Sequence, residues 1–197
     1  MTFEQIQRQL GALKGGDKLP AVSHEDSNDD IPANWDAAEA FPQCAKVINT
    51  LVDQSACGSC WAMAVSSAAS HRLCIASNGA ITTQLSARDL LSCCTSCGFG
   101  CQGGYPSTAW SWLTKTGIVT GKNYHDFSRC VSYPFQPCGH HVDTFDPACS
   151  TLDFDTPKCQ KSCDTDVRLL TAYLQLLQSH FLSCNRGTLA LTESKTP

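Results

Sequence analysis

Two cysteines near the first third of the chain stand in front of a tryptophan and a run of small residues. The segment 53–67 reads DQSACGSCWAMAVSS, and it places Gln54 six residues before Cys60. Ser59 is a suitable N-cap, so Cys60 is expected in the first turn of a helix. There, unpaired backbone N–H groups and the helix dipole favour the thiolate form of a cysteine. The pattern therefore indicates that Cys60 is a nucleophile.

Gln54 adds a hydrogen-bond donor of the kind that acyl transfer needs. Its side-chain amide is suited to the oxyanion that forms when a thiolate attacks a carbonyl carbon, with the backbone N–H of Cys60 as the second donor. Two other interpretations stay open at this point. Cys60 is equally suited to a disulfide in a chain this rich in cysteine, and an isolated glutamine is most often a solvated surface residue.

The elements that position this segment are predicted to be helices. The first spans residues 60–77 and stops before an Asn-Gly pair. Ser86 and Asp89 resemble a capping box that opens a second, short helix. The third has Pro106 near its start and Gly117 just past its end. From 124 to 163 prolines, glycines and cysteines dominate, which predicts long loops held by disulfides.

The cysteine content bounds the class of protein. Fourteen cysteines in 197 residues indicate an oxidising compartment and a disulfide framework. The alternative of zinc binding rests on Cys57/Cys60 and Cys94/Cys97, whose two-residue spacing is that of metal knuckles. The other cysteines follow at irregular intervals that suit disulfides better, so neither a metal nor a cofactor is expected. A thioredoxin-like use of CGSC lacks the alternating strand and helix pattern around it.

Charge and hydropathy exclude other partners. The net charge is −4 and the basic residues are scattered, so neither nucleic acid nor an anionic membrane is an expected partner. No apolar run approaches the roughly 20 residues of a membrane helix. The N-terminus lacks the apolar region of a secretion signal, and we expect such a signal upstream of this sequence.

The chain divides into three regions by composition. Residues 1–30 are polar and charged, as in a linker or the remnant of a prosegment. The domain is expected to begin at residue 31, where aromatic residues, cysteines and turn residues appear. From 164 to 197 a leucine-rich stretch with helical spacing precedes a polar end, which predicts an amphipathic helix followed by a disordered tail.

Several motifs together carry a resemblance to a known family. CGSCW is joined by IPANWDAAEAFPQC, SARDLLSCC, GCQGGYPSTAW, PFQPCGHHVDTFDPAC and DTPKC. Over residues 31–163 the chain thus resembles the papain-like cysteine proteases, and among them the cathepsin B-like enzymes. The resemblance implies an α+β papain-like fold, of which this chain holds mainly the helical left domain with disulfide-rich loops. The β-rich right domain is expected to be largely missing, as if the chain were truncated or frameshifted after Cys163.

The resemblance also implies roles for individual residues. Cys60 becomes the nucleophile, Gln54 the oxyanion-hole donor, and Gly103 and Gly104 line the substrate cleft. Cys60 and Cys184 are left outside the implied disulfides. The implied pairs are Cys44–Cys74, Cys57–Cys101, Cys93–Cys159, Cys94–Cys97, Cys130–Cys163 and Cys138–Cys149.

A histidine pair lies in the loop that the last of these disulfides closes. In cathepsin B-like enzymes the equivalent loop, here 138–149, blocks one end of the cleft. Its histidines, here His140 and His141, bind the terminal carboxylate of a substrate, which implies release of C-terminal dipeptides. Gly139 stands where the family commonly has a glutamate. Without the resemblance, two exposed loop histidines or an adventitious metal site are the ordinary interpretations.

The resemblance further requires a histidine base and an asparagine that orients it. None of the six histidines fits that role. His71 lies eleven residues along the same predicted helix, about 16 Å from Cys60 at 1.5 Å per residue. This chain alone is therefore expected to be an inactive relative of a cysteine peptidase. The competing hypothesis is a non-catalytic, disulfide-bonded module.

The resemblance extends to partners and location. It implies peptide and protein substrates, cystatin-type inhibitors, a zymogen form, and a lysosomal or extracellular location.

Overall fold

The structure is a computed structural model that describes residues 2–7, 9–21, 32–139 and 145–164. Within these ranges the regular elements are helices, connected by loops with a few isolated β-bridges. The predicted tail helix lies outside the described residues. No described helix is long and apolar enough to cross a membrane. The elements are α1 (Phe3–Gln7), α2 (Ala37–Ala40), η1 (Pro42–Cys44), α3 (Ala45–Ile48), α4 (Cys60–Ala76), α5 (Ala87–Cys93), η2 (Gly100–Gln102), α6 (Pro106–Thr116) and η3 (Cys149–Thr151).

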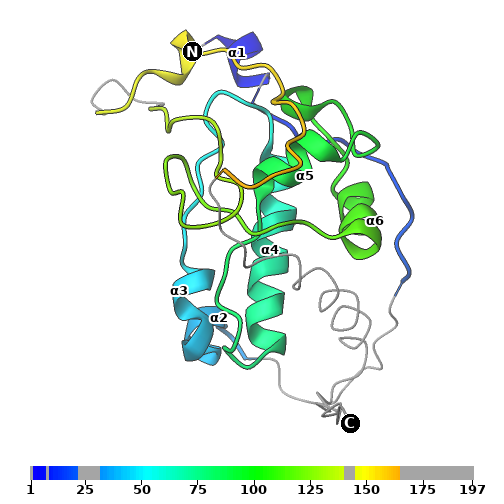
Figure 1. Cartoon of the computed structure of the whole chain (residues 1–197), viewed down its shortest axis with the longest axis vertical. Coiled ribbons are helices and arrows are strands. Elements are labelled where there is room, and N and C mark those ends of the chain that lie inside the picture. Colours follow the sequence, from blue (N-terminus) through cyan, green and yellow to red (C-terminus); the bar gives the residue numbers. More distant parts are fainter. Residues whose placement is uncertain (1, 8, 22–31, 140–144, 165–197) are drawn as a thin grey trace.

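Helix α4 is the axis of the molecule. Figure 1 shows it running through the centre, with α5 and α6 on one side and α2 and α3 beside its far end. The helix is rich in alanine and serine, so neighbouring elements approach it closely, and Trp61 and Leu73 are buried at its two ends. The main apolar core forms where α4 meets α5 and α6, around Leu90 and Leu113.

All three predicted helices are confirmed, and the start of α5 and the two ends of α6 follow the predicted signals. Ser86 accepts a hydrogen bond from the backbone N–H of Asp89 at 3.1 Å, which caps α5. The Asp89 carboxylate accepts from the N–H of Val119 at 3.1 Å, and so joins α5 to the loop after α6. Gly117 ends α6 with φ of 79°, a left-handed conformation that favours glycine.

Disulfides hold the loops that surround these helices. The described residues form six, and they are the same six pairs that the family resemblance implies. Cys44–Cys74 joins η1 to α4, and Cys57–Cys101 joins the segment before α4 to η2. Crosslinks of this kind typically contribute about 2–4 kcal/mol each, mainly by restricting the unfolded chain. The remaining four are Cys93–Cys159, Cys94–Cys97, Cys130–Cys163 and Cys138–Cys149.

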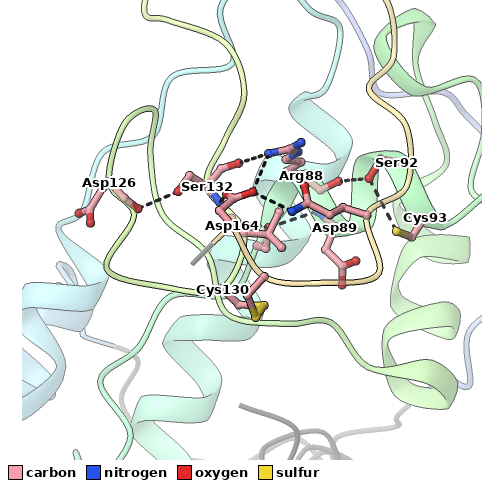
Figure 2. Close-up of polar contacts among 12 residues, drawn as sticks. Arg88, Asp89, Ser92, Cys93, Asp126, Cys130, Ser132 and Asp164 are labelled. Atoms are coloured by element: carbon pink, nitrogen blue, oxygen red, sulfur yellow. Dashed lines mark hydrogen bonds and ion pairs between the residues drawn. A yellow bond between two sulfur atoms is a disulfide. The ribbon is translucent and has the colours of Figure 1, made fainter. Parts of the chain in front are cut away.

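A polar network fixes the loop that follows α6. The Asp164 carboxylate accepts a hydrogen bond from the N–H of Ser132 at 2.8 Å and lies 3.5 Å from the Arg88 guanidinium of α5. Arg88 also donates to the carbonyl of Ser132 at 3.4 Å, so both backbone groups of Ser132 are held (Figure 2). The Ser132 side chain donates to the carbonyl of Asp126 at 2.8 Å. This part of the loop is therefore anchored to α5.

Candidate active site

Cys60 is the first residue of α4, and it is the free cysteine among the described residues. The loop before it is held by hydrogen bonds and a disulfide. The Asp53 carboxylate accepts from the N–H of Ser55 at 2.6 Å, and Ser55 adopts φ of 58°. Cys57 is tied to η2 by its disulfide, and the N–H of Gly58 donates to the carbonyl of Cys101 at 2.8 Å. A half-buried thiol is thus presented at a fixed helix N-terminus.

Ser59 occupies the N-cap position of α4, as predicted, but it does not cap the helix with its side chain. Its hydroxyl lies 2.7 Å from the phenolic oxygen of Tyr133 instead. The Ser59 carbonyl still accepts from the N–H groups of Ala62 and Met63. The first turn of α4, which begins at Cys60, is therefore closed by the backbone of Ser59 and not by its side chain.

The N-terminal segment 9–17 passes directly over the thiol. The N–H of Gly11 donates to the Cys60 sulfur at 3.2 Å. The side-chain amide of Gln54 donates to the backbone carbonyl of Gln9 at 3.0 Å. Gln54 and Cys60, which the sequence paired as oxyanion donor and nucleophile, therefore both contact one extended piece of backbone, and Gln54 already binds a carbonyl oxygen.

Gly104 binds the same segment, and Gly103 lies beside it. The N–H of Gly104 donates to the carbonyl of Gly11 at 2.8 Å, and the carbonyl of Gly104 accepts from the N–H of Leu13 at 2.9 Å. A Cβ on Gly104 would lie 2.6 Å from the Trp61 ring, and Gly103 has φ of 109°. Glycine is thus required at 104 by the packing of Trp61 and favoured at 103 by the left-handed backbone. The backbone of these two residues, along which residues 11–13 lie, is called the ledge below.

The far end of the segment is held at the start of α6. Ser107 donates to the carbonyl of Gly15 at 3.0 Å, and the Thr108 hydroxyl accepts from the N–H of Asp17 at 3.1 Å. The composition of residues 1–30 predicted a linker or prosegment but not these contacts. The one residue in the segment whose type is tied to these contacts is Gly11, because a Cβ there would lie 1.7 Å from the carbonyl oxygen of Gly58 and prevent the close approach of the two backbones.

The described histidines do not pair with the thiol. Burial lowers the pKa of His71, although a hydrogen bond with the Val47 backbone opposes that shift. His125 has φ of 58° and its ring stacks on Tyr124, with centroids 4.0 Å apart. The sulfur's hydrogen bond within the described ranges is the one from Gly11. The predicted histidine pair, at 140 and 141, lies outside the described residues, as do the histidines at 24 and 180.

The described residues contain no group of three histidine, cysteine or acidic side chains that would hold a metal ion.

Comparison with known proteins gives a consistent result. The model of the papain family of cysteine proteases matches residues 31–183. Cathepsin B-like cysteine proteinase 4 of Caenorhabditis elegans is 45% identical over 168 residues, which are 83% of this chain and 50% of that protein. Cathepsin B-like cysteine proteinase 6 of the same organism is 50% identical over 157 residues, 79% of this chain and 40% of that protein.

A third relative and a solved structure agree with these. The cathepsin B-like cysteine proteinase of Schistosoma japonicum is 45% identical over 146 residues, 74% of this chain and 42% of that protein. The structure of procathepsin B S9 from Trypanosoma congolense superposes with a TM-score of 0.68 at 35% identity, covering 86% of this chain and 52% of that one. The chain thus spans about half the length of the curated relatives it matches. It belongs to the papain family of cysteine proteases, and within that family it is cathepsin B-like.

Proposed function

We propose that Cys60 is the nucleophile of a cathepsin B-like cysteine peptidase and that Gln54 is its oxyanion donor. The observation that carries this is the position of the N-terminal segment. A backbone carbonyl binds the Gln54 amide while the sulfur of Cys60 lies against the same stretch of backbone. A substrate carbonyl bound in that way stands within reach of the thiolate.

The proposed reaction proceeds through an acyl-enzyme. The thiolate attacks the carbonyl carbon, a C–S bond forms, and the developing oxyanion accepts from Gln54 and from the N–H of Cys60. The C–N bond then breaks, and the leaving amine takes up the proton that the thiol gave to the histidine base of a complete site. Water hydrolyses the thioester and restores the thiol. The ledge of Gly103 and Gly104 aligns the peptide for this attack.

The N-terminal segment acts in this proposal as a prosegment. Residues 9–17 occupy the ledge and contact the thiol, so a substrate binds only when they leave. Residues 1–30 are then the cover of a zymogen, 31–163 the left domain with its loop at 138–149, and 164–197 a separate tail.

The described residues supply the thiol, the oxyanion donor and the ledge, but no histidine base. The 197-residue chain on its own is therefore proposed to lack amide turnover. Substrates of the active form are proposed to be peptides and proteins, and cystatin-type inhibitors its protein ligands. The family and the disulfides support a lysosomal or extracellular location.

The loop at 138–149 is proposed to confer release of C-terminal dipeptides. Its base is closed by the disulfide and by hydrogen bonds of Gly139 with Pro147 and Cys149. In a form that holds a complete site, replacing His140 and His141 with alanine removes two donors to the terminal carboxylate. Dipeptide release should fall about tenfold or more, because bonds to charged groups contribute about 1.5–3 kcal/mol. Cleavage inside longer peptides is the control and should be retained; an equal loss of both activities would show that the histidines do not select the carboxylate.

Alkylation of Cys60 distinguishes a peptidase from a non-catalytic module. At pH 6, iodoacetamide should label Cys60 faster in the folded Gly11→Ala chain than in the same chain unfolded in denaturant, because only the folded chain holds the sulfur at the N-terminus of α4. Peptide mass mapping separates Cys60 from Cys184. A Cys60 that is slower to react when folded, with the segment displaced, would support the module.

A further inference from the structure

A buried phenol lies behind the proposed active site. Tyr133 is only 3% exposed, and its hydroxyl donates to the backbone carbonyl of Gln54 at 2.9 Å. The same oxygen lies 2.7 Å from the hydroxyl of Ser59, which is fully buried. A phenol has one proton, and the Gln54 carbonyl receives it, so Ser59 must donate to Tyr133. The hydrogen bonds thus run from Ser59 through Tyr133 to Gln54.

Tyr133 is itself held firmly. Its N–H donates to the carbonyl of Lys122 at 2.8 Å, and its ring meets Phe135 edge-on at a centroid distance of 5.4 Å. Its neighbour Ser132 is fixed by Arg88 and Asp164, as Figure 2 shows. Burial raises the pKa of Tyr133, so the hydroxyl keeps its proton at physiological pH. The phenol is therefore a fixed donor and acceptor.

The two partners of this phenol are the two ends of the loop before the thiol. Gln54 carries the side-chain donor of the oxyanion site, and Ser59 immediately precedes Cys60, whose N–H is the other donor. Resting on the proposed function, we propose that Tyr133 is a positioning residue that fixes these two donors relative to each other. It also holds the Ser59 hydroxyl, which therefore does not cap the first turn of α4.

Two reagents that modify Cys60, one through an oxyanion and one without, distinguish positioning of the oxyanion donors by Tyr133 from a purely structural role of this residue. The aryl ester p-nitrophenyl acetate acylates a thiolate through a tetrahedral oxyanion. The buffer takes the thiol proton, a C–S bond forms, the C–O bond to the aryl group breaks, and p-nitrophenolate leaves. Its leaving group needs no acid, so no histidine is required. Iodoacetamide reacts by displacement of iodide at a saturated carbon and forms no oxyanion. Both reagents must displace segment 9–17 and both need the thiolate, so these effects cancel in the ratio of the two rates at Cys60.

In the full chain, Tyr133→Phe should lower the ratio of acylation to alkylation at Cys60 by about tenfold. Complete removal of one oxyanion donor typically lowers the rate of acyl transfer about 10²–10³-fold, and a donor that is present but misplaced lowers that rate by less. Gln54→Ala should lower the ratio further, by about 100-fold. Tyr124→Phe removes the hydroxyl of a tyrosine whose ring stacks on His125; it is the matched control and should leave the ratio unchanged. Peptide mapping assigns both adducts to Cys60.

Tyr133→Phe leaves the buried Ser59 hydroxyl without its partner, which costs about 1–3 kcal/mol of stability. The double variant Tyr133→Phe/Ser59→Ala removes both hydroxyls and should recover stability while the ratio stays low. A ratio within about twofold of the wild type in both variants would overturn the positioning role. Failure of the proposed function looks different: in the Gly11→Ala chain, where the segment no longer covers the thiol, Cys60 would show no acylation above that of the same chain unfolded, and the inference would fall with it.

Discussion

Replacing Gly11 with alanine should raise the rate of Cys60 alkylation by iodoacetamide about 100-fold. A Cβ at residue 11 would lie 1.7 Å from the carbonyl oxygen of Gly58 and 2.4 Å from its carbonyl carbon. The backbone of Gly58 is held in place, because its N–H donates a hydrogen bond to the carbonyl of Cys101 and its neighbour Cys57 forms a disulfide with Cys101. The segment must therefore leave. It is held near the thiol by at least three backbone hydrogen bonds at about 1 kcal/mol each, and about 1.4 kcal/mol corresponds to tenfold.

The control for this variant is Lys14→Ala, a change at an exposed side chain of the same segment. It should leave the rate within about twofold of the wild type, since it removes none of the backbone hydrogen bonds of residues 9–17. Alkylation is followed by mass mapping of the Cys60 peptide. If Gly11→Ala and Lys14→Ala react at the same rate, the N-terminal segment does not cover the thiol.

The second large effect is the absence of amide turnover in the same uncovered variant. Among the described residues no histidine partners the thiolate, so none of them supplies the acid that protonates the leaving amine; such acid–base assistance is typically worth about 10²–10⁴-fold. His71 bonds with the Val47 backbone, and His125 stacks on Tyr124. Acylation by an aryl ester should nevertheless occur once per chain, because its leaving group needs no proton.

Hydrolysis of a fluorogenic dipeptide amide by Gly11→Ala measures this directly. The expected signal equals that of Gly11→Ala/Cys60→Ala. Sustained hydrolysis that disappears with Cys60→Ala would show that the chain contains a base, and His125→Ala and His180→Ala would then identify it.

Local rules were enough to predict the helices that carry the thiol. The Ser86 cap, the proline at the start of α6 and the glycine after it act within one turn, and the structure reproduces each. Local rules do not predict which cysteines pair, because disulfide connectivity depends on distances between segments that are far apart in the sequence. The pairs followed from the family resemblance and not from spacing.

The contacts that the sequence could not supply are all between distant segments. Ser59 has the right type for a helix cap, yet its hydroxyl bonds to Tyr133, 74 residues away. No pattern near Tyr133 distinguishes it from a core aromatic residue. For residues 9–17, composition indicates only a polar segment with few apolar side chains to bury. Composition does not reveal backbone hydrogen bonds, and it is through their backbone that these residues bind to Gly104 and Cys60.

The most direct test of the central claim is the site of acylation when the Gly11→Ala chain is mixed briefly with a p-nitrophenyl ester of an N-protected dipeptide. The account predicts one acyl group per chain, bound as a thioester at Cys60. It should be removed by hydroxylamine, absent from the Cys60→Ala variant, and reduced in Gln54→Ala. Acyl groups spread over exposed lysines, with Cys60 no more modified than in the unfolded chain, would contradict the assignment of Cys60 as the nucleophile.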